Sequence, residues 1–275
     1  MNFSFKHSTM KQIFHQTGFV LCTVIYLAAI SGCATDSLSA PDGSSGVGGS
    51  FARFMIVGDF MYLVDNEKIK TLNISDPADP TLLNEQAVAE GVESIFRIGS
   101  RLFVGSNTGL FLYSFGDDGL PKREGSFDYG ELGFPIYPCD PVVANDSLAY
   151  VTLNTTIAVE NCNRNSLQQV KVLNVFDVTD IQNPMLLRQY DMLNPQGLGL
   201  DGQLLFVCDN EFGLKVYNIA DPLNIQLVTE LTGFTAHDVI PLGGLLLVVG
   251  PDNVYQIDYS DLGNIHVIST IPIGV

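Results

Sequence analysis

The chain has 275 residues, enough for one large domain with a substantial core. Hydrophobic residues make up 46% of it and charged residues only 16%, below the roughly 25% of an average soluble domain. The charge is strongly acidic, with 30 Asp and Glu against 13 Lys and Arg and a net charge of −17. Nucleic acids and anionic lipid surfaces are bound by cationic patches. The composition therefore argues against nucleic acid as a partner.

Residues 1–32 have the features of an export signal. Residues 1–17 contain two lysines and no acid, and residues 18–30 form an uncharged apolar run. This run is shorter than the roughly 20 residues that span a bilayer, but it fits the apolar core of a signal peptide. It ends in the sequence ISGC, with Cys33 last, which resembles the lipobox of bacterial lipoproteins. The resemblance implies cleavage before Cys33 and lipidation of its thiol, whereas the alternative is an ordinary signal peptide with an incidental cysteine.

Residues 33–50 are rich in Gly and Ser and predict a flexible tether that carries the lipid. We expect the folded domain at residues 51–275. The protein is then exported and anchored through Cys33 in a bacterial membrane, on the periplasmic face or the cell surface. Ala34 follows the cysteine, where an Asp would favour retention at the inner membrane in some bacteria, so we favour the outer membrane.

From residue 54 onward the chain repeats a unit of about 41 residues. Each copy has four short runs rich in β-branched and aromatic residues, separated by Gly, Asp, Asn and Pro. In the first copy the runs are Phe54–Val57, Met61–Val64, Ile69–Ile74 and Thr81–Glu85. An Asp after the third run marks every copy, and these markers are evenly spaced except for one longer step between the second and third: Asp76, Asp117, Asp180, Asp221 and Asp261.

A repeat of this length with four strands is typical of a propeller blade, which takes roughly 40–45 residues in one common class. The sequence therefore predicts an all-β protein, a β-propeller of five four-stranded blades. A β-helix is the weaker alternative, because its coils are much shorter.

The third run resembles the motif of the LVIVD-repeat family, seen here as KTLNISDPADP, NVFDVTDIQNP and KVYNIADPLNI. The resemblance covers residues 54–275 and is loose in the second and fifth copies. It implies a propeller-like fold in exported, often lipid-anchored bacterial proteins. It implies no settled biochemical activity, so the family is functionally uncharacterised.

The third copy is longer than the others, and most of its extra residues lie between its second and third runs, with the rest before its first. In a propeller these two places open on the same face. We therefore expect extended loops on one face at the third blade, where loops often carry function. Cys139 and Cys162 lie in the two insertions, and an exported protein meets an oxidising compartment. We predict a Cys139–Cys162 disulfide, with two buried free thiols as the alternative, and we expect Cys208 to be a core thiol.

Polar residues recur at the start of every innermost strand. Each second strand contains a valine, and counting back the same number of residues from it in every copy reaches the start of the innermost strand. The residues found there are Arg53, Glu93, Asp140, Gln196 and Asp238, and His237 adjoins Asp238. These side chains are expected to ring one mouth of the axial channel, on the face that carries the insertions. Such a ring can bind a polar ligand, or Ca²⁺ or Mg²⁺ through Glu93, Asp140 and Asp238. His237 with Asp238 or Glu93 would make an acid–base pair; the alternative is that the ring only contacts water.

The recurrent Asp-containing turns, such as SDPADP, are expected on the opposite face, where Asp and Asn hydrogen-bond backbone N–H groups. The sequence has no Gly-x-Ser-x-Gly elbow, no Gly-rich phosphate loop and no clustered zinc ligands. We therefore expect a cell-envelope lipoprotein whose propeller binds a protein or polymer partner. One alternative is a metal-dependent hydrolase or lactonase that uses the axial carboxylates. Another is a structural spacer in the envelope.

Overall fold

Short apolar runs separated by turn-forming residues fold into β-strands throughout the computed structural model. The structure describes residues 49–116, 118–132, 141–161 and 164–274. These residues lie within a single structural unit. None of the helical segments in them has the length and apolar character that crossing a bilayer requires.

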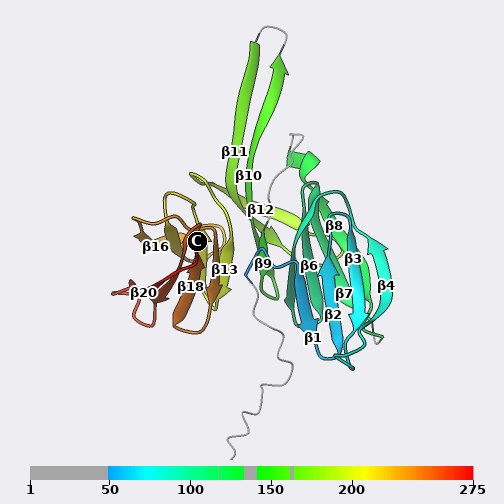
Figure 1. Ribbon diagram of the computed structural model, residues 1–275. Helices are drawn as coiled ribbons and strands as arrows, with labels where there is room; N and C mark the ends of the chain where they lie inside the picture. The colour runs from blue at the N-terminus through cyan, green and yellow to red at the C-terminus, as the bar shows by residue number, and fades with distance from the viewer. Residues whose placement is uncertain (1–48, 117, 133–140, 162–163, 275) are drawn as a thin grey trace, which may run out of the picture. The chain divides into compact units, whose positions relative to one another are not determined.

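The strands form five antiparallel sheets, each made of four strands that are consecutive in the sequence (Figure 1). The first sheet contains β1 (Phe54–Val57), β2 (Phe60–Val64), β3 (Lys68–Asn73) and β4 (Thr81–Ala87). The second contains β5 (Val92–Ile98), β6 (Arg101–Ser106), β7 (Gly109–Phe115) and β8 (Pro121–Asp128), followed by the 3-10 helix η1 (Tyr129–Leu132).

The third sheet contains β9 (Val142–Ala144), β10 (Leu148–Asn161), β11 (Arg164–Asp177) and β12 (Met185–Asp191). The fourth contains β13 (Leu198–Asp201), β14 (Leu204–Cys208), β15 (Leu214–Asn218) and β16 (Gln226–Leu231). The fifth contains β17 (Asp238–Pro241), β18 (Leu245–Val249), β19 (Asn253–Asp258) and β20 (His266–Pro272). The five-bladed β-propeller predicted from the repeat is confirmed, and the strands of the first blade closely follow the predicted runs.

Each blade carries the same irregularity between its third and fourth strands. The pairing shifts by one residue near the middle of the third strand, which marks a β-bulge and increases the local twist. The shifts occur at Thr71/Leu72, Leu112/Tyr113, Val175/Phe176, Val216/Tyr217 and Gln256/Ile257. The repeat is thus preserved in the backbone as well as in the sequence.

The predicted role of the Asp-containing turns is confirmed where the structure describes them. In four blades the marker Asp accepts a hydrogen bond from the backbone N–H two residues later, at 2.9–3.0 Å: Asp76, Asp180, Asp221 and Asp261. In the second blade Asp117 lies outside the described residues, and the neighbouring Asp118 accepts the bond from Leu120 instead. These carboxylates fix the turn between the third and fourth strands.

The core is divided among the junctions between consecutive blades. Among the described residues, four hydrophobic clusters join the first blade to the second, the second to the third, the third to the fourth and the fourth to the fifth. The innermost strands follow the same order, with β5 against β1, β9 against β5 and β13 against both β9 and β17. Each blade therefore depends on its sequence neighbours for burial of its apolar faces.

The first and last blades meet differently. No cluster among the described residues joins β17–β20 to β1–β4. On the innermost strand β1, the side chains of Phe54 and Ile56 are 55% and 36% exposed, whereas Leu198 at the start of β13 is fully buried. The junction between the fifth and first blades is therefore an open seam.

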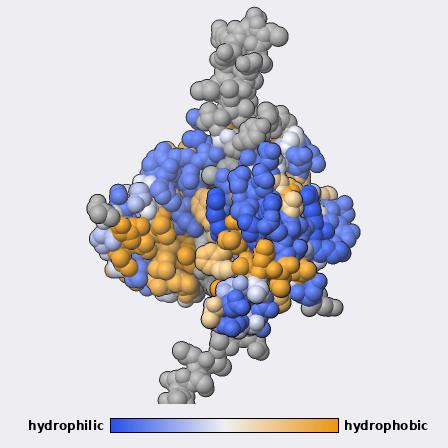
Figure 2. Space-filling view, turned by 45° about the vertical axis from the view of Figure 1, so that its right-hand side comes forward, coloured by the Kyte–Doolittle hydropathy of each residue, from blue (hydrophilic) through white to orange (hydrophobic). Residues whose placement is uncertain are grey.

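Large apolar side chains are also exposed on the outer strands of several blades. Figure 2 shows hydrophobic residues gathered over the lower part of one face and hydrophilic residues over its upper part. The exposed large apolar side chains of the outermost strands, within the described residues, are Leu82, Leu83, Met185, Leu227, Val228, Val267, Ile268 and Ile271.

The extended loop predicted between the second and third strands of the third blade is instead a regular β-hairpin. Strands β10 and β11 pair over 14 residues each, from Leu148↔Asp177 to Asn161↔Arg164. The neighbouring strand β9 covers only the beginning of β10, and β12 covers only the end of β11. The pairs from Asn154↔Lys171 outward form a two-stranded arm that projects from the blade (Figure 1). At roughly 3.3 Å per residue, the arm is about 25 Å long.

The cysteine predictions fall partly outside the described residues. Cys33, Cys139 and Cys162 are among the residues that the structure does not describe. Cys208 lies in β14, free and fully buried, which confirms the expected core thiol. Burial, and secondarily the nearby Asp238 and Asp209 carboxylates, raise the pKa of this thiol well above its usual value.

Candidate functional site

The predicted polar positions lie where the innermost strands begin. Asp238 is the first residue of β17 and Glu93 the second of β5; Arg53 directly precedes β1, and Gln196 lies shortly before β13. Asp140 is outside the described residues. The mouth at these strand starts is on the same face as the β10–β11 arm, because each second strand ends where its first strand begins.

Asp238 is engaged by the segment that enters the first blade. The Ser50 hydroxyl donates a hydrogen bond to Asp238 Oδ1 at 3.0 Å, and the backbone N–H groups of Ser50 and Phe51 also donate to this carboxylate. A Cβ atom on Gly49 would lie 1.9 Å from Asp238 Oδ2, so a side chain at this position would force the Asp238 carboxylate to move. The carboxylate of Asp238 is thus occupied by donors of the chain itself.

The same segment crosses the mouth to other blades. The Ser50 hydroxyl accepts a hydrogen bond from the Leu198 N–H at 2.8 Å, and the Ala52 carbonyl accepts one from the Ile95 N–H at 2.9 Å. Ser50 is 1% exposed. Residues 49–52, which we call the mouth segment, therefore tie the fifth, fourth and second blades together on the face where the first blade starts.

Burial controls the protonation of Asp238. Loss of hydration raises the pKa of this carboxyl above its ordinary value, and the hydrogen bonds from Ser50, Phe51 and the Val239 N–H oppose the rise without cancelling it. The charged form is therefore more costly in the folded protein than in the unfolded chain.

The other predicted mouth residues contribute mainly through their backbones. His237 donates its N–H to the Val249 carbonyl, and its own carbonyl accepts from Gly197. The Gln196 N–H donates to the Cys208 carbonyl, so the segment before β13 is held against the end of β14 at this mouth. Arg53 is exposed and Glu93 half-buried, and neither side chain has an ion pair among the described residues.

No three His, Cys, Asp or Glu side chains in the described part of the chain lie close enough together to hold a metal ion. The predicted set of Glu93, Asp140 and Asp238 includes one residue outside that part, and Asp238 is hydrogen-bonded to the mouth segment. Within the described residues, the mouth consists of segments from different blades that are joined mainly by backbone hydrogen bonds.

A polar network fixes the base of the β10–β11 arm. Asn154 of β10 donates to the Asn194 side-chain oxygen at 2.7 Å and to the Pro195 carbonyl at 3.0 Å. Asn194 in turn donates its side-chain N–H to Glu211 and its backbone N–H to Asp209, each at 2.6 Å.

The network ends in an ion pair. Asp209 is completely buried and pairs with Lys215, so its charge is compensated inside the fourth blade. Thr152 of β10, just inside the blade, adds a second contact, because its hydroxyl donates to the Gln196 carbonyl at 2.5 Å. The arm is therefore anchored on a rigid base between the third and fourth blades.

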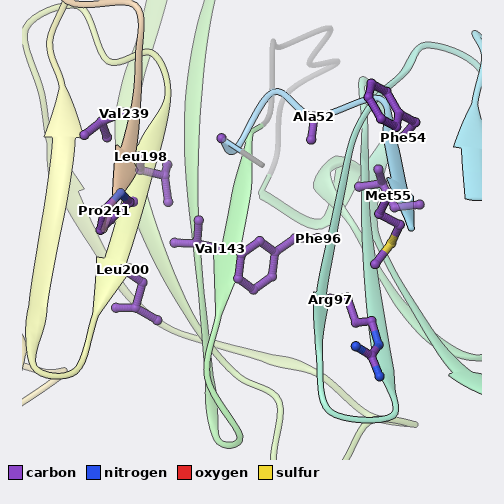
Figure 3. Close-up of a pocket in the computed structure, with 13 residues that line it drawn as sticks. Ala52, Phe54, Met55, Phe96, Arg97, Val143, Leu198, Leu200, Val239 and Pro241 are labelled. Carbon is purple, nitrogen blue, oxygen red and sulfur yellow. The ribbon is translucent and has the colours of Figure 1, made fainter. Parts of the chain in front are cut away.

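An apolar cavity of about 230 Å³ lies between the innermost strands (Figure 3). It is lined from all five blades, by residues of β1, β5, β9, β13 and β17 and by Gly49 and Ala52 of the mouth segment. In Figure 3 the labelled Ala52 lies at one end, and Val143 and Phe96 project between the blades. The mouth segment thus covers one end of the axial cavity.

Arg97 is the charged residue that lines this cavity. It lies near the end of β5, at the opposite end from Ala52 (Figure 3). Its guanidinium lies 5.8 Å from the centroid of the Phe115 ring, and its Nε atom is buried without a hydrogen-bond partner. The cavity therefore combines apolar walls with one cationic side chain whose Nε–H lacks an acceptor.

No family model and no curated protein matches the sequence. The structure is similar to the computationally designed protein Ika8, with a TM-score of 0.56 and 11% identity over 79% of this chain and 60% of that one. It is also similar to a protein from Lactobacillus plantarum, with a TM-score of 0.56 and 13% identity over 80% and 74% of the two chains. AztD from Citrobacter koseri matches with a TM-score of 0.50 and 13% identity over 76% and 58%. The chain is a β-propeller.

At these identities the likeness shows the β-propeller fold alone. The propeller spans less than two thirds of the length of Ika8 and of AztD.

Sequence reasoning missed Ser50 and Arg97. Ser50 belongs to the Gly- and Ser-rich stretch that predicts a tether, and no local pattern indicates its bond to a residue of the last blade. Arg97 did leave a signal, because it is a single basic residue inside the apolar run IFRIG of an innermost strand.

Proposed function

We propose that the protein is an exported lipoprotein of the LVIVD-repeat type that works as a binding module in the cell envelope. The observation that carries this proposal is the β10–β11 arm, a two-stranded extension anchored by partly buried polar contacts at its base. A projecting hairpin has unpaired backbone groups along both edges, and such edges pair with other chains. We propose that a protein or polymer partner binds this arm.

The lipobox-like sequence and the tether supply the location in this proposal. Lipidation of Cys33 would hold the propeller at a bacterial membrane, and residues 34–48 would leave it free to reach a partner. Replacement of Cys33 by Ala should move the protein from the membrane fraction to the soluble fraction. Retention of the variant in the membrane fraction would reject the anchor.

The arm can be removed without disturbing the register of the blade. Replacing residues 156–169 by Asn-Gly leaves the facing residues Thr155 and Val170 joined by a two-residue turn of the type that favours hairpins. We expect the melting temperature of this truncated variant to stay within about 2 °C of the parent, because the polar base of the arm is retained.

Partner binding is tested by photo-crosslinking in envelope extracts. A photoreactive residue at position 155, on the arm, should give a discrete crosslinked product, and the same residue at position 70, on β3 of the first blade, should not. Affinity capture with the full chain should recover the same product, and capture with the truncated variant should lose it. A product that forms equally from both positions, or capture that survives truncation, would reject the arm as the contact.

The alternatives predict other results. A spacer would show no product that depends on the arm. A metal-dependent hydrolase or lactonase would gain activity with Ca²⁺ or Mg²⁺ and lose it on replacement of Glu93 or Asp140.

A further inference from the structure

The buried Nε–H of Arg97 has no acceptor. Its Nε atom is buried and lacks a hydrogen-bond partner, and no ion pair within the described residues includes its guanidinium. Arg101, on the next strand, is satisfied by comparison, because it donates to the carbonyls of Asp146 and Val178. A buried N–H donor without an acceptor is unfavourable, so the Nε–H of this cationic side chain favours an anionic oxygen beside it.

The walls of the cavity favour an apolar molecule. Phe96, Val143, Leu198 and Leu200 come from three different blades and line the space between the mouth segment and Arg97 (Figure 3). Pockets for drug-sized ligands occupy about 300–1,000 Å³ and combine apolar walls with a few polar groups that fix orientation. At about 230 Å³ this cavity has the same character and suits a smaller molecule.

The open seam gives such a molecule a way in. Phe54 and Met55 of β1 line one side of the cavity, and Val239 and Pro241 of β17 line another. These two strands belong to the first and last blades, which no hydrophobic cluster of the described residues joins. A ligand can therefore reach the axis between them while the other blade junctions stay packed.

We propose that the axial cavity binds a small carboxylate with an apolar body, such as a short fatty acid. The carboxylate pairs with the Arg97 guanidinium, and the apolar body lies against Phe96, Val143 and Leu200. This site is independent of the proposed function, because it uses neither the β10–β11 arm nor the lipid anchor.

Octanoate is the probe, and its binding to the purified protein is measured by isothermal titration calorimetry. We expect Arg97→Gln to weaken octanoate binding about tenfold or more, because a charge-assisted pair is lost. Arg188→Gln is the matched control, since Arg188 also lies 5.8 Å from an aromatic centroid, that of Tyr190, but on the outer strand β12. It should bind octanoate as the parent does.

A second pair of variants tests the apolar walls without touching the charge. Leu200→Phe adds volume inside the cavity and should weaken octanoate binding, whereas Leu227→Phe, on the exposed side of β16, should not. Octanol, which has the same chain length without the charge, should bind more weakly than octanoate.

Three results would overturn the proposal. They are no octanoate binding by the parent protein, equal binding of octanol and octanoate, and equal losses in the Arg97 and Arg188 variants. Thermal melts of each variant show whether it is folded, and if Arg97→Gln is not, the Leu200→Phe and octanol results still decide.

Discussion

Ser50 and Asp238 are 188 residues apart in the sequence, and the hydroxyl of one donates a hydrogen bond to the carboxylate of the other at 3.0 Å. This bond joins the segment that enters the first blade to the first strand of the last one. No hydrophobic cluster of the described residues joins these two blades, so the hydrogen bond from Ser50 connects them on this face without a shared apolar core.

Ser50→Ala should therefore destabilise the protein. It removes the donor to Asp238 and the acceptor for the Leu198 N–H, and leaving such buried groups unpaired costs about 1–3 kcal/mol. The free energy of unfolding from urea titration measures the effect. Ser75→Ala, at an exposed serine in the turn after β3, is the control and should change stability little.

The stability contribution of Asp238 should fall as the pH rises. Its pKa is raised in the folded protein above the ordinary value of 3.8, so between these two values the folded state binds more protons than the unfolded chain. The contribution is fully present below 3.8 and is lost as the pH rises through the folded pKa. Asp238→Asn removes this titration, so the stability of the parent should decline relative to the variant across that window. If the free energies of unfolding of the two proteins changed equally with pH, the raised pKa expected for Asp238 would be contradicted.

The stability contribution of the turn carboxylate Asp180 should fall as the pH is lowered, which is the opposite of the dependence expected for Asp238. The Asn183 side chain and the Gln182 N–H donate to Asp180 and lower the pKa of its carboxyl. The stability that this carboxylate provides is present above its ordinary pKa and is lost as the pH falls through the lowered value.

Removal of Asp180 gives a direct test of the turn. Asp180→Ala should lower the melting temperature by about 2 °C at neutral pH, because two donors lose their acceptor. Asp191→Ala, on the exposed side of β12, is the matched control, and a larger loss there would argue against a special role of the turn.

Cys208 should be inert in the folded protein. It is fully buried, and burial raises the pKa of its thiol, so little reactive thiolate forms at neutral pH. Alkylation followed by mass mapping should leave the Cys208 peptide unlabelled in buffer and label it completely in urea. Rapid labelling in buffer would mean that the junction between the fourth and fifth blades opens often.

Much of the fold could be predicted because each blade is specified locally. The alternation of apolar residues predicts the strands, and the Asp turns predict where the third strand ends, which the bonds of Asp76 and Asp221 confirm. The insertion in the third copy predicts the position of the β10–β11 arm, although its regular pairing follows only from the structure. The bulge in each blade left no evident mark in the residue pattern.

The candidate site was harder to predict because it depends on contacts between distant repeats. The spacing placed Asp238 at the start of an innermost strand, but its partner Ser50 lies in a stretch whose composition indicates flexibility. The cavity depends on how five strands converge, which no single repeat encodes. Arg97 became informative only when its surroundings showed that its Nε–H has no acceptor.

In the part of the chain that the structure describes, every sheet is formed from four strands that are consecutive in the sequence, and no blade borrows a strand from another. Propellers closed by a shared strand cannot change size without splitting a blade. Here, duplication or deletion of one repeat by unequal recombination would leave each surviving blade whole. The number of blades is thus open to evolutionary change in this architecture, and with it the width of the axial space that a ligand would occupy.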